Sequence, residues 1–115
     1  MFLQGTCGDD DLDDLFDLLS DDFTYWSILT RQPLDKTQLR QDVEQRRRGM
    51  RITLELNRCI NEGETVVIEV DGDCALADGT HYASPMVYIV DTRDGRIVSV
   101  REYTDTRYAA QALGI

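Results

Sequence analysis

The residues with the greatest capacity for chemistry in this sequence are carboxylic acids in segments that alternate between apolar and polar positions. Glu69 and Asp71 stand two residues apart in ETVVIEVDGDCAL, so a strand would point both to the same side. Glu102 stands in RIVSVREYT, a second segment of this kind. Carboxylates packed together at low dielectric cannot all ionise easily, and a protonated acid beside a charged one can perform general acid and base catalysis.

Other kinds of site have little support in the sequence. His81 is the single histidine, and Cys7, Cys59 and Cys74 are an odd number without C-x-x-C spacing, so we expect free thiols rather than a zinc site or a disulfide framework. The acidic run over residues 9–17 lacks EF-hand spacing, which favours a solvated helix face over the alternative of a Ca²⁺ site. We therefore expect no metal and no cofactor.

Size and charge narrow the class of protein further. A chain of 115 residues, 42% hydrophobic and 30% charged, predicts one folded domain over residues 1–115. The net charge of −10 disfavours a nucleic-acid partner. No run of about 18 apolar residues is present, and the first residues lack the features of a signal peptide, so we expect no membrane partner and a cytoplasmic location.

The elements that must position the acids can be predicted from periodicity. Residues 9–19 carry apolar side chains at helical spacing, and residues 21–29 predict a strand with Tyr25 and Ser27 on one face. Asp35, followed three residues later by Gln38, resembles a capping box that opens a helix ending at about Arg48.

From residue 51 onward the apolar period changes to two. Strands are predicted over 51–60, 64–76, 80–90 and 96–104, separated by the short Gly-containing turns NEGE, ADGT and TRDG. Short turns imply antiparallel neighbours, and Asp105 is a suitable N-cap for a last short helix. The order of elements indicates an α+β fold in which helices cover one face of a single curved sheet.

Three C-terminal motifs resemble a known family. They are a Gly-x-x-Tyr strand (79–82), Asp-Gly-x-Ile (94–97) and Arg-Glu-Tyr-x-Asp (101–105). The chain resembles the SnoaL-like branch of the nuclear transport factor 2-like superfamily from about Asp10 to Leu113. This branch is similar to limonene-epoxide hydrolases, ketosteroid isomerases and polyketide cyclases, and the resemblance implies a cone-shaped antiparallel sheet with helices on its concave face.

The resemblance also implies a site on the concave face. Asp71, Glu102 and Tyr25 are its expected catalytic residues. The expected substrate-binding residues are Ser27, Glu69, Ser84, Met86, Tyr88 and Val100. The implied activity is acid-base chemistry of the isomerase, cyclase or hydrolase type on a small, largely apolar molecule. The alternative is a module of the same fold that binds a ligand or dimerises without catalysis.

Two positions depart from the hydrolase pattern. Ser27 stands where the resemblance implies an Asn, and Glu69 stands where it implies the Arg that bridges two acids, so epoxide hydrolysis as such is not expected. Structural interpretations stay open for the acids, because Glu69 could pair with Arg58 or Arg101, and Asp71 could form a turn or bulge with the glycine that follows. Glu102 could equally accept hydrogen bonds from its neighbours, and the tyrosines could be wall aromatics.

Two further expectations concern the surroundings of the site. If Glu69 and Asp71 face inward, then Val66, Ile68 and Val70 face outward, and this apolar set predicts a homodimer through the outer face of the sheet. The family's first helix is longer than the few residues that precede the predicted loop QGTCGDD, so we expect a truncated first helix and a cavity almost without a lid. Three alternatives follow: the cavity is wide open, a partner chain closes it, or the natural chain begins upstream of Met1.

Overall fold

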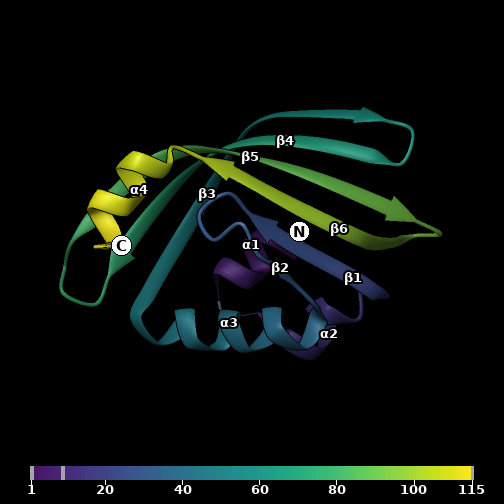
Figure 1. Cartoon of the computed structure of the whole chain (residues 1–115), viewed down its shortest axis with the longest axis horizontal. Coiled ribbons are helices and arrows are strands. Elements are labelled where there is room, and N and C mark those ends of the chain that lie inside the picture. Colours follow the sequence, from purple (N-terminus) through teal and green to yellow (C-terminus); the bar gives the residue numbers. More distant parts are fainter. Residues whose placement is uncertain (1, 9, 115) are drawn as a thin grey trace.

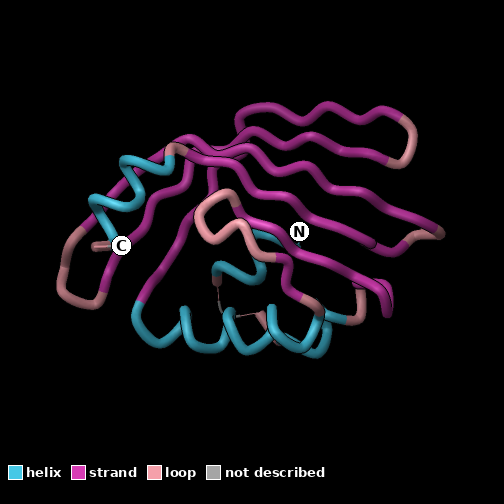
Figure 2. The backbone as a smooth tube through the Cα atoms, in the orientation of Figure 1, coloured by secondary structure: helices cyan, strands magenta, loops and turns pink. Residues whose placement is uncertain are grey.

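The computed structural model of the protein describes residues 2–8 and 10–114, which form one six-stranded sheet with helices on one side and at one end (Figures 1 and 2). Along the chain the elements are α1 (Phe2–Cys7), α2 (Leu12–Phe16), β1 (Leu19–Ser27), β2 (Pro33–Leu34), α3 (Lys36–Gly49), β3 (Met50–Glu62), β4 (Thr65–Leu76), β5 (His81–Arg93), β6 (Arg96–Thr104) and α4 (Thr106–Leu113). The predicted α+β cone with helices against its concave face is confirmed.

The sheet is a meander to which the first strands are added at one edge. The strand order is β2-β1-β6-β5-β4-β3, with β3 to β6 antiparallel and β1 parallel to β6. The β5–β6 turn consists of Asp94 and Gly95, both at positive φ (52° and 78°), as a two-residue type I′ hairpin requires. This turn fixes the register that brings β6, the strand of Glu102, between β1 and β5.

Helix α3 begins and packs as the sequence predicts. Both hydrogen bonds of the capping box between Asp35 and Gln38 are present. Leu39 and Val43 are 2% and 0% exposed, so this helix face packs against the sheet. The helix lies across the concave side of the sheet, as Figure 1 shows, and it therefore forms the wall opposite the strands.

The N-terminal elements differ from the prediction. The helix expected over residues 9–19 ends at Phe16, because Leu19 joins β1, pairs with Ile97 of β6 and is fully buried. The segment predicted as a loop is largely the short helix α1, whose Phe2 and Leu3 are each only 5% exposed. Burial of these side chains, rather than helix propensity, stabilises such a short helix.

The hydrophobic core lies between the concave face and the helices. Its largest fully buried side chains are Phe23, Leu19, Val43, Val70 and Val100. Phe2 packs edge-on against Phe16 and Phe23, with ring centroids 6.0 and 6.4 Å apart. These contacts hold α1 and α2 under the sheet.

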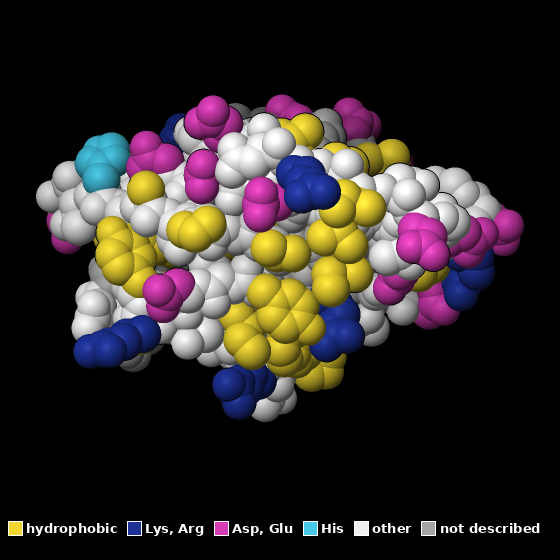
Figure 3. Space-filling view, turned by 90° about the horizontal axis from the view of Figure 1, so that it is seen from above, with side chains coloured by type: hydrophobic (Ala, Val, Ile, Leu, Met, Phe, Trp, Pro, Cys, Tyr) yellow, Lys and Arg dark blue, Asp and Glu magenta, His cyan; other side chains and the backbone are white. Residues whose placement is uncertain are grey.

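No helix within residues 2–8 and 10–114 covers the convex face of the sheet (Figure 1). Cross-strand pairing aligns Ile60, Val67, Ile89, Arg101 and Trp26 in one row across it. The guanidinium of Arg101 lies 5.3 Å from the ring of Trp26, and Figure 3 shows apolar side chains gathered with basic and acidic ones on this face. Among the described residues, no helix is long and apolar enough to cross a membrane.

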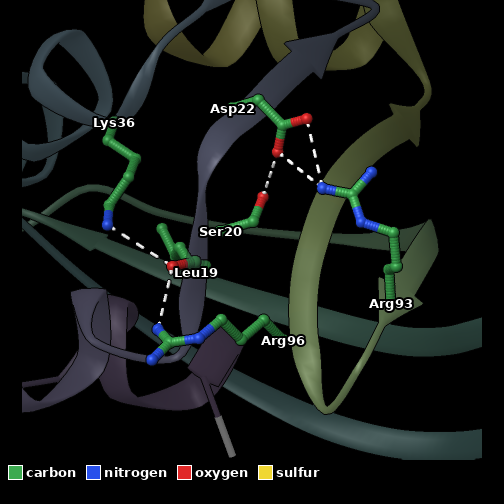
Figure 4. A network of polar contacts seen from close by, with 6 residues as sticks. All are labelled: Leu19, Ser20, Asp22, Lys36, Arg93 and Arg96. Atoms are coloured by element: carbon green, nitrogen blue, oxygen red, sulfur yellow. Dashed lines mark hydrogen bonds and ion pairs between the residues drawn. The ribbon is translucent and has the colours of Figure 1, made fainter.

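A polar network ties the start of β1 to the β5–β6 hairpin, away from the concave interior (Figure 4). Arg93 Nη2 contacts both carboxylate oxygens of Asp22 at 3.1 and 3.2 Å, and Ser20 Oγ donates to the same carboxylate at 2.7 Å. Arg96 donates to the carbonyl of Asp17 at 2.7 Å. These contacts help to end α2 and begin the strand.

Candidate active site

A cavity lies between the concave face of the sheet and the helices. It has a volume of about 180 Å³ and is lined mostly by apolar side chains from α1, the segment 28–34, α3 and the strands β1 and β3–β6. For comparison, an engineered protein cavity of about 150 Å³ holds one benzene molecule. The enclosed space therefore suits a ligand of about one ring.

Glu102 and Tyr25 form a hydrogen-bonded pair inside this cavity. The phenol of Tyr25 donates to Glu102 Oε2, and no hydrogen bond within the described residues uses the other carboxylate oxygen. β6 places Glu102 directly between Ser27 of β1 and Tyr88 of β5, so these three side chains share the concave face. Glu102 is 9% exposed, and one of its oxygens remains for a ligand.

Burial sets the protonation of this pair. Desolvation raises the pKa of Glu102, while the Tyr25 hydrogen bond and the charge of Arg46 act in the opposite direction. Burial, and then the nearby Glu102, raise the pKa of Tyr25 well above its usual value. Tyr25 therefore stays a hydrogen-bond donor, and Glu102 keeps its proton to a higher pH than an exposed glutamate does.

Two charged side chains of α3 stand at the rim of the cavity. Arg46 Nη1 lies 4.0 Å from Asp42 Oδ2, and their side chains are 25% and 56% exposed. Leu39, Asp42, Val43 and Arg46 have the i, i+3, i+4, i+7 spacing of one helix face. Neither charged residue was predicted from the sequence to line the cavity. Their spacing relative to Leu39 and Val43, which places them on the buried face of the helix, is the pattern from which this could have been predicted.

Two thiols line the cavity as well. Cys7 and Cys74 both belong to its wall, and burial raises the pKa of each. A raised pKa keeps a thiol protonated and unreactive at neutral pH. All three cysteines, including exposed Cys59, are free, as the sequence predicts.

The predicted inward orientation of Glu69 and Asp71 is wrong. Both are exposed on the convex face, where Asn57 Nδ2 donates to Asp71 Oδ2 at 3.0 Å. The register is the physical reason, because residues directly opposite each other share a face. Tyr88 pairs with Ile68 and Met86 pairs with Val70, so the apolar side chains of β4 point inward and its acids point outward.

The remaining predicted site residues lie on the concave side, but only some reach the cavity. Ser27, Met86 and Tyr88 line it. Ser84 is buried outside the lining, with its hydroxyl 3.1 Å from that of Thr104, and Val100 belongs to the core at 1% exposure. His81 is exposed, with Nδ1 3.6 Å from Asp73 Oδ1.

The chemistry available to this cavity is that of one carboxyl group and its phenol partner. Within the described lining, Glu102 and Asp42 are the acids, and Asp42 stands at the exposed rim. A mechanism that needs one acid to activate water and another to protonate an epoxide lacks the second buried group. One carboxyl group suffices to take a proton from one atom of a ligand and return it to another.

Comparison with known proteins agrees with this architecture. The chain has no match among curated proteins. Its fold is similar to that of a hypothetical protein with a ketosteroid isomerase-like fold from Catenulispora acidiphila in complex with trimethylamine (TM-score 0.82, 18% identity, covering 96% of this chain and 87% of that one). It is also similar to an epoxide hydrolase of the limonene-epoxide hydrolase type from M. tuberculosis (TM-score 0.80, 16% identity, covering 96% of this chain and 83% of that one). A third similar structure is a putative polyketide cyclase from Xanthomonas campestris (TM-score 0.83, 17% identity, covering 97% of this chain and 90% of that one). The model of the SnoaL-like domain matches residues 2–100, and the chain therefore belongs to the SnoaL-like family of the nuclear transport factor 2-like superfamily.

Proposed function

We propose that this protein binds a small, largely apolar organic molecule in its cone and moves a proton on it with Glu102. The observation that carries the proposal is the buried Glu102–Tyr25 pair with one carboxylate oxygen unused by the described residues. Tyr25 orients the carboxyl group, and Ser27, Met86 and Tyr88 form the surrounding wall. Relatives named as cyclase and epoxide hydrolase support a catalytic role on this fold.

Isomerisation or aldol-type cyclisation fits the geometry better than hydrolysis. Glu102 as carboxylate removes a proton next to a carbonyl, becomes the neutral acid, and returns the proton to another atom of the same molecule. Its raised pKa makes it a stronger base than an exposed carboxylate. The size of the enclosed space restricts the reacting part of the substrate to about one ring.

Proton exchange in D₂O tests this activity without knowledge of the natural substrate. Cyclohexanone and cyclohex-3-enone are incubated with the protein, and loss of the α-hydrogen signals is followed by ¹H NMR. The wild-type protein should accelerate exchange, and Glu102→Gln should lower the rate at least about 100-fold. Glu69→Gln is the matched control, because it makes the same change on the convex face. Equal exchange by Glu102→Gln and wild type would contradict the catalytic assignment.

The second candidate is a binding module of the same fold without turnover. The single buried acid and the unreactive state of both cavity thiols favour it. It predicts saturable chemical-shift changes at cavity residues on ligand addition, with no proton exchange for any bound ketone. The same NMR samples therefore separate the two functions.

We also propose a homodimer through the convex face. Val66, Ile68 and Val70 were predicted to form that interface, but Ile68 and Val70 are buried on the concave side. The row of Ile60, Val67 and Ile89 supplies an apolar convex surface instead. In analytical ultracentrifugation, Ile89→Glu should shift the sedimentation of the protein from dimer toward monomer. Asp71→Asn, a control substitution on the same convex face, should leave the dimer unchanged. A wild-type protein that sediments as a monomer at about 100 μM would overturn this proposal.

The free cysteines support a reducing compartment, and we propose the cytoplasm. Fractionation of cells that express the natural gene tests this location, with recovery in an oxidising compartment as the contrary result.

A further inference from the structure

The cavity holds one negative group without an ion-pair partner. Three charged side chains line it, namely Glu102, Asp42 and Arg46. Arg46 Nη1 lies 4.0 Å from Asp42 Oδ2 at the rim, and the charge of Arg46 also favours the ionised form of Glu102. Among the described residues, no ion pair includes Glu102. The formal charge of the lining is therefore −1 when Glu102 is ionised.

The inner wall includes electron-rich groups, and three of its hydroxyl donors are engaged by neighbouring residues. Tyr25 gives its hydroxyl proton to Glu102, and Tyr88 gives its proton to the sulfur of Met86 at 3.8 Å. The hydroxyl of Thr6 donates to the carbonyl of Leu3 at 2.9 Å. Aromatic rings and thioether sulfur attract cations.

Size and long-range charge point to the same class of ligand. The cavity volume of about 180 Å³ accommodates a substituted ammonium group. The whole chain carries a net charge of −10, which raises the local concentration of cations. A small cation can therefore enter and form a direct ion pair with Glu102.

From these observations we infer that the cavity selects a small organic cation of the substituted-ammonium class over neutral and anionic molecules of the same shape. The inference rests on the proposed function, because it names the ligand class of that same site. Glu102 supplies the counter-charge, and the rings of Tyr25, Tyr82 and Tyr88 with the sulfur of Met86 surround the alkyl groups.

Three probes of nearly identical shape test the selection. They are choline, its neutral isostere 3,3-dimethylbutan-1-ol and the anion 3,3-dimethylbutanoate, each titrated into the full chain and followed by NMR and calorimetry. Choline should bind at least about tenfold more tightly than the alcohol, and the anion should bind most weakly. Glu102→Gln should reduce choline affinity to that of the alcohol while changing alcohol affinity less than about twofold. Glu69→Gln should change none of these affinities.

The pH dependence provides a readout that needs no variant. Choline keeps its charge at every pH, so its affinity should rise as pH rises through the titration of Glu102, while that of the alcohol stays constant. The titratable and charged groups that act on Glu102 or share its cavity are Tyr25 on β1, Cys7 on α1, Asp42 and Arg46 on α3, Cys74 on β4, and Tyr82 and Tyr88 on β5.

The outcomes separate this inference from the proposed function. If the alcohol or the anion binds as tightly as choline, the cavity binds small molecules but the cation inference is wrong. If choline binds selectively while no ketone exchanges its protons, the ligand class stands and the catalytic proposal fails. If none of the probes binds at about 10 mM, a concentration about tenfold above a millimolar Kd, the cation inference is overturned, while the ketone exchange experiment still decides the catalytic proposal.

Discussion

Residues of the same type are buried on one face of the sheet and exposed to solvent on the other. On the concave face, Glu102 is buried beside Tyr25 and its pKa is raised. On the convex face, Glu69 and Asp71 are exposed acids, and Tyr103 packs near the guanidinium of Arg101 at 5.6 Å. Carboxylates and phenols occur on both faces, so residue type alone does not identify the site. The face determines the solvation, and solvation determines the chemistry.

The largest difference in unfolding free energy is expected between a core substitution on the concave face and an exposed substitution on the convex face. Phe23→Ala should lower the free energy of unfolding by about 3–5 kcal/mol, because this side chain is 1% exposed and packs against Phe2. The control is Thr24→Ser at the neighbouring exposed residue, which should change the free energy of unfolding by no more than about 0.5 kcal/mol. Urea unfolding followed by circular dichroism measures both, and similar losses would refute the assignment of the two faces.

A smaller contrast is expected between the tyrosines. Tyr25→Phe removes the donor to Glu102 and should cost about 1–2 kcal/mol of unfolding free energy, because an acceptor in the cavity loses its partner. The pKa of Glu102 should rise further, since the Tyr25 hydrogen bond holds it down. Tyr103→Phe, on the convex face, should cost no more than about 0.5 kcal/mol. A Glu102 carboxyl carbon that titrates identically in Tyr25→Phe and wild type would contradict the pairing.

The pH dependence of stability sharpens the comparison between acids. Because the pKa of folded Glu102 is raised, its contribution to stability is fully present below the unfolded pKa and is lost as pH rises through the folded pKa. Glu102→Gln should therefore gain stability relative to wild type with increasing pH, by about 1.4 kcal/mol for each pH unit that separates the folded pKa from the unfolded pKa. Melting curves of both proteins from pH 4 to 8 test this, and a stability difference that stays constant over that range would contradict it.

The smallest effect is expected at the exposed network of Figure 4. Ser20 and Arg93 lower the pKa of Asp22, so the contribution of this acid is present above its unfolded pKa and is lost as pH falls. Asp22→Asn should lower the melting temperature slightly at low salt and not at about 1 M NaCl, where screening is strong. Asp21→Asn is the control, and a salt-independent loss would argue against an ion pair with Arg93.

The sequence was sufficient for most elements of the fold because local signals there agree with tertiary packing. The capping box at Asp35, the Gly-containing turns and the alternation of Phe23, Tyr25 and Ser27 all appear in the structure as predicted. The end of α2 was not predictable from helical spacing, because Leu19 satisfies that spacing and is nevertheless drawn into β1 by pairing with β6.

The candidate site was predicted in part. Tyr25 and Glu102 share the concave face as expected, and their catalytic role remains a prediction. The prediction for β4 is wrong because hydrophobic burial overrides the site positions that the family resemblance implies for its acids. Ile68 and Val70 are the stronger signal, because burial of two branched apolar side chains outweighs any benefit from turning acids inward.

The acid and much of the cavity wall come from parts of the molecule with different constraints. Glu102 is fixed within a central strand, whereas Leu29, Thr30 and Gln32 approach the same cavity from the connection after β1. Connections tolerate substitution better than central strands do. Libraries confined to these three positions should therefore retarget the protein to new ligands while its proton-handling group stays in place, which makes the scaffold suitable for laboratory evolution.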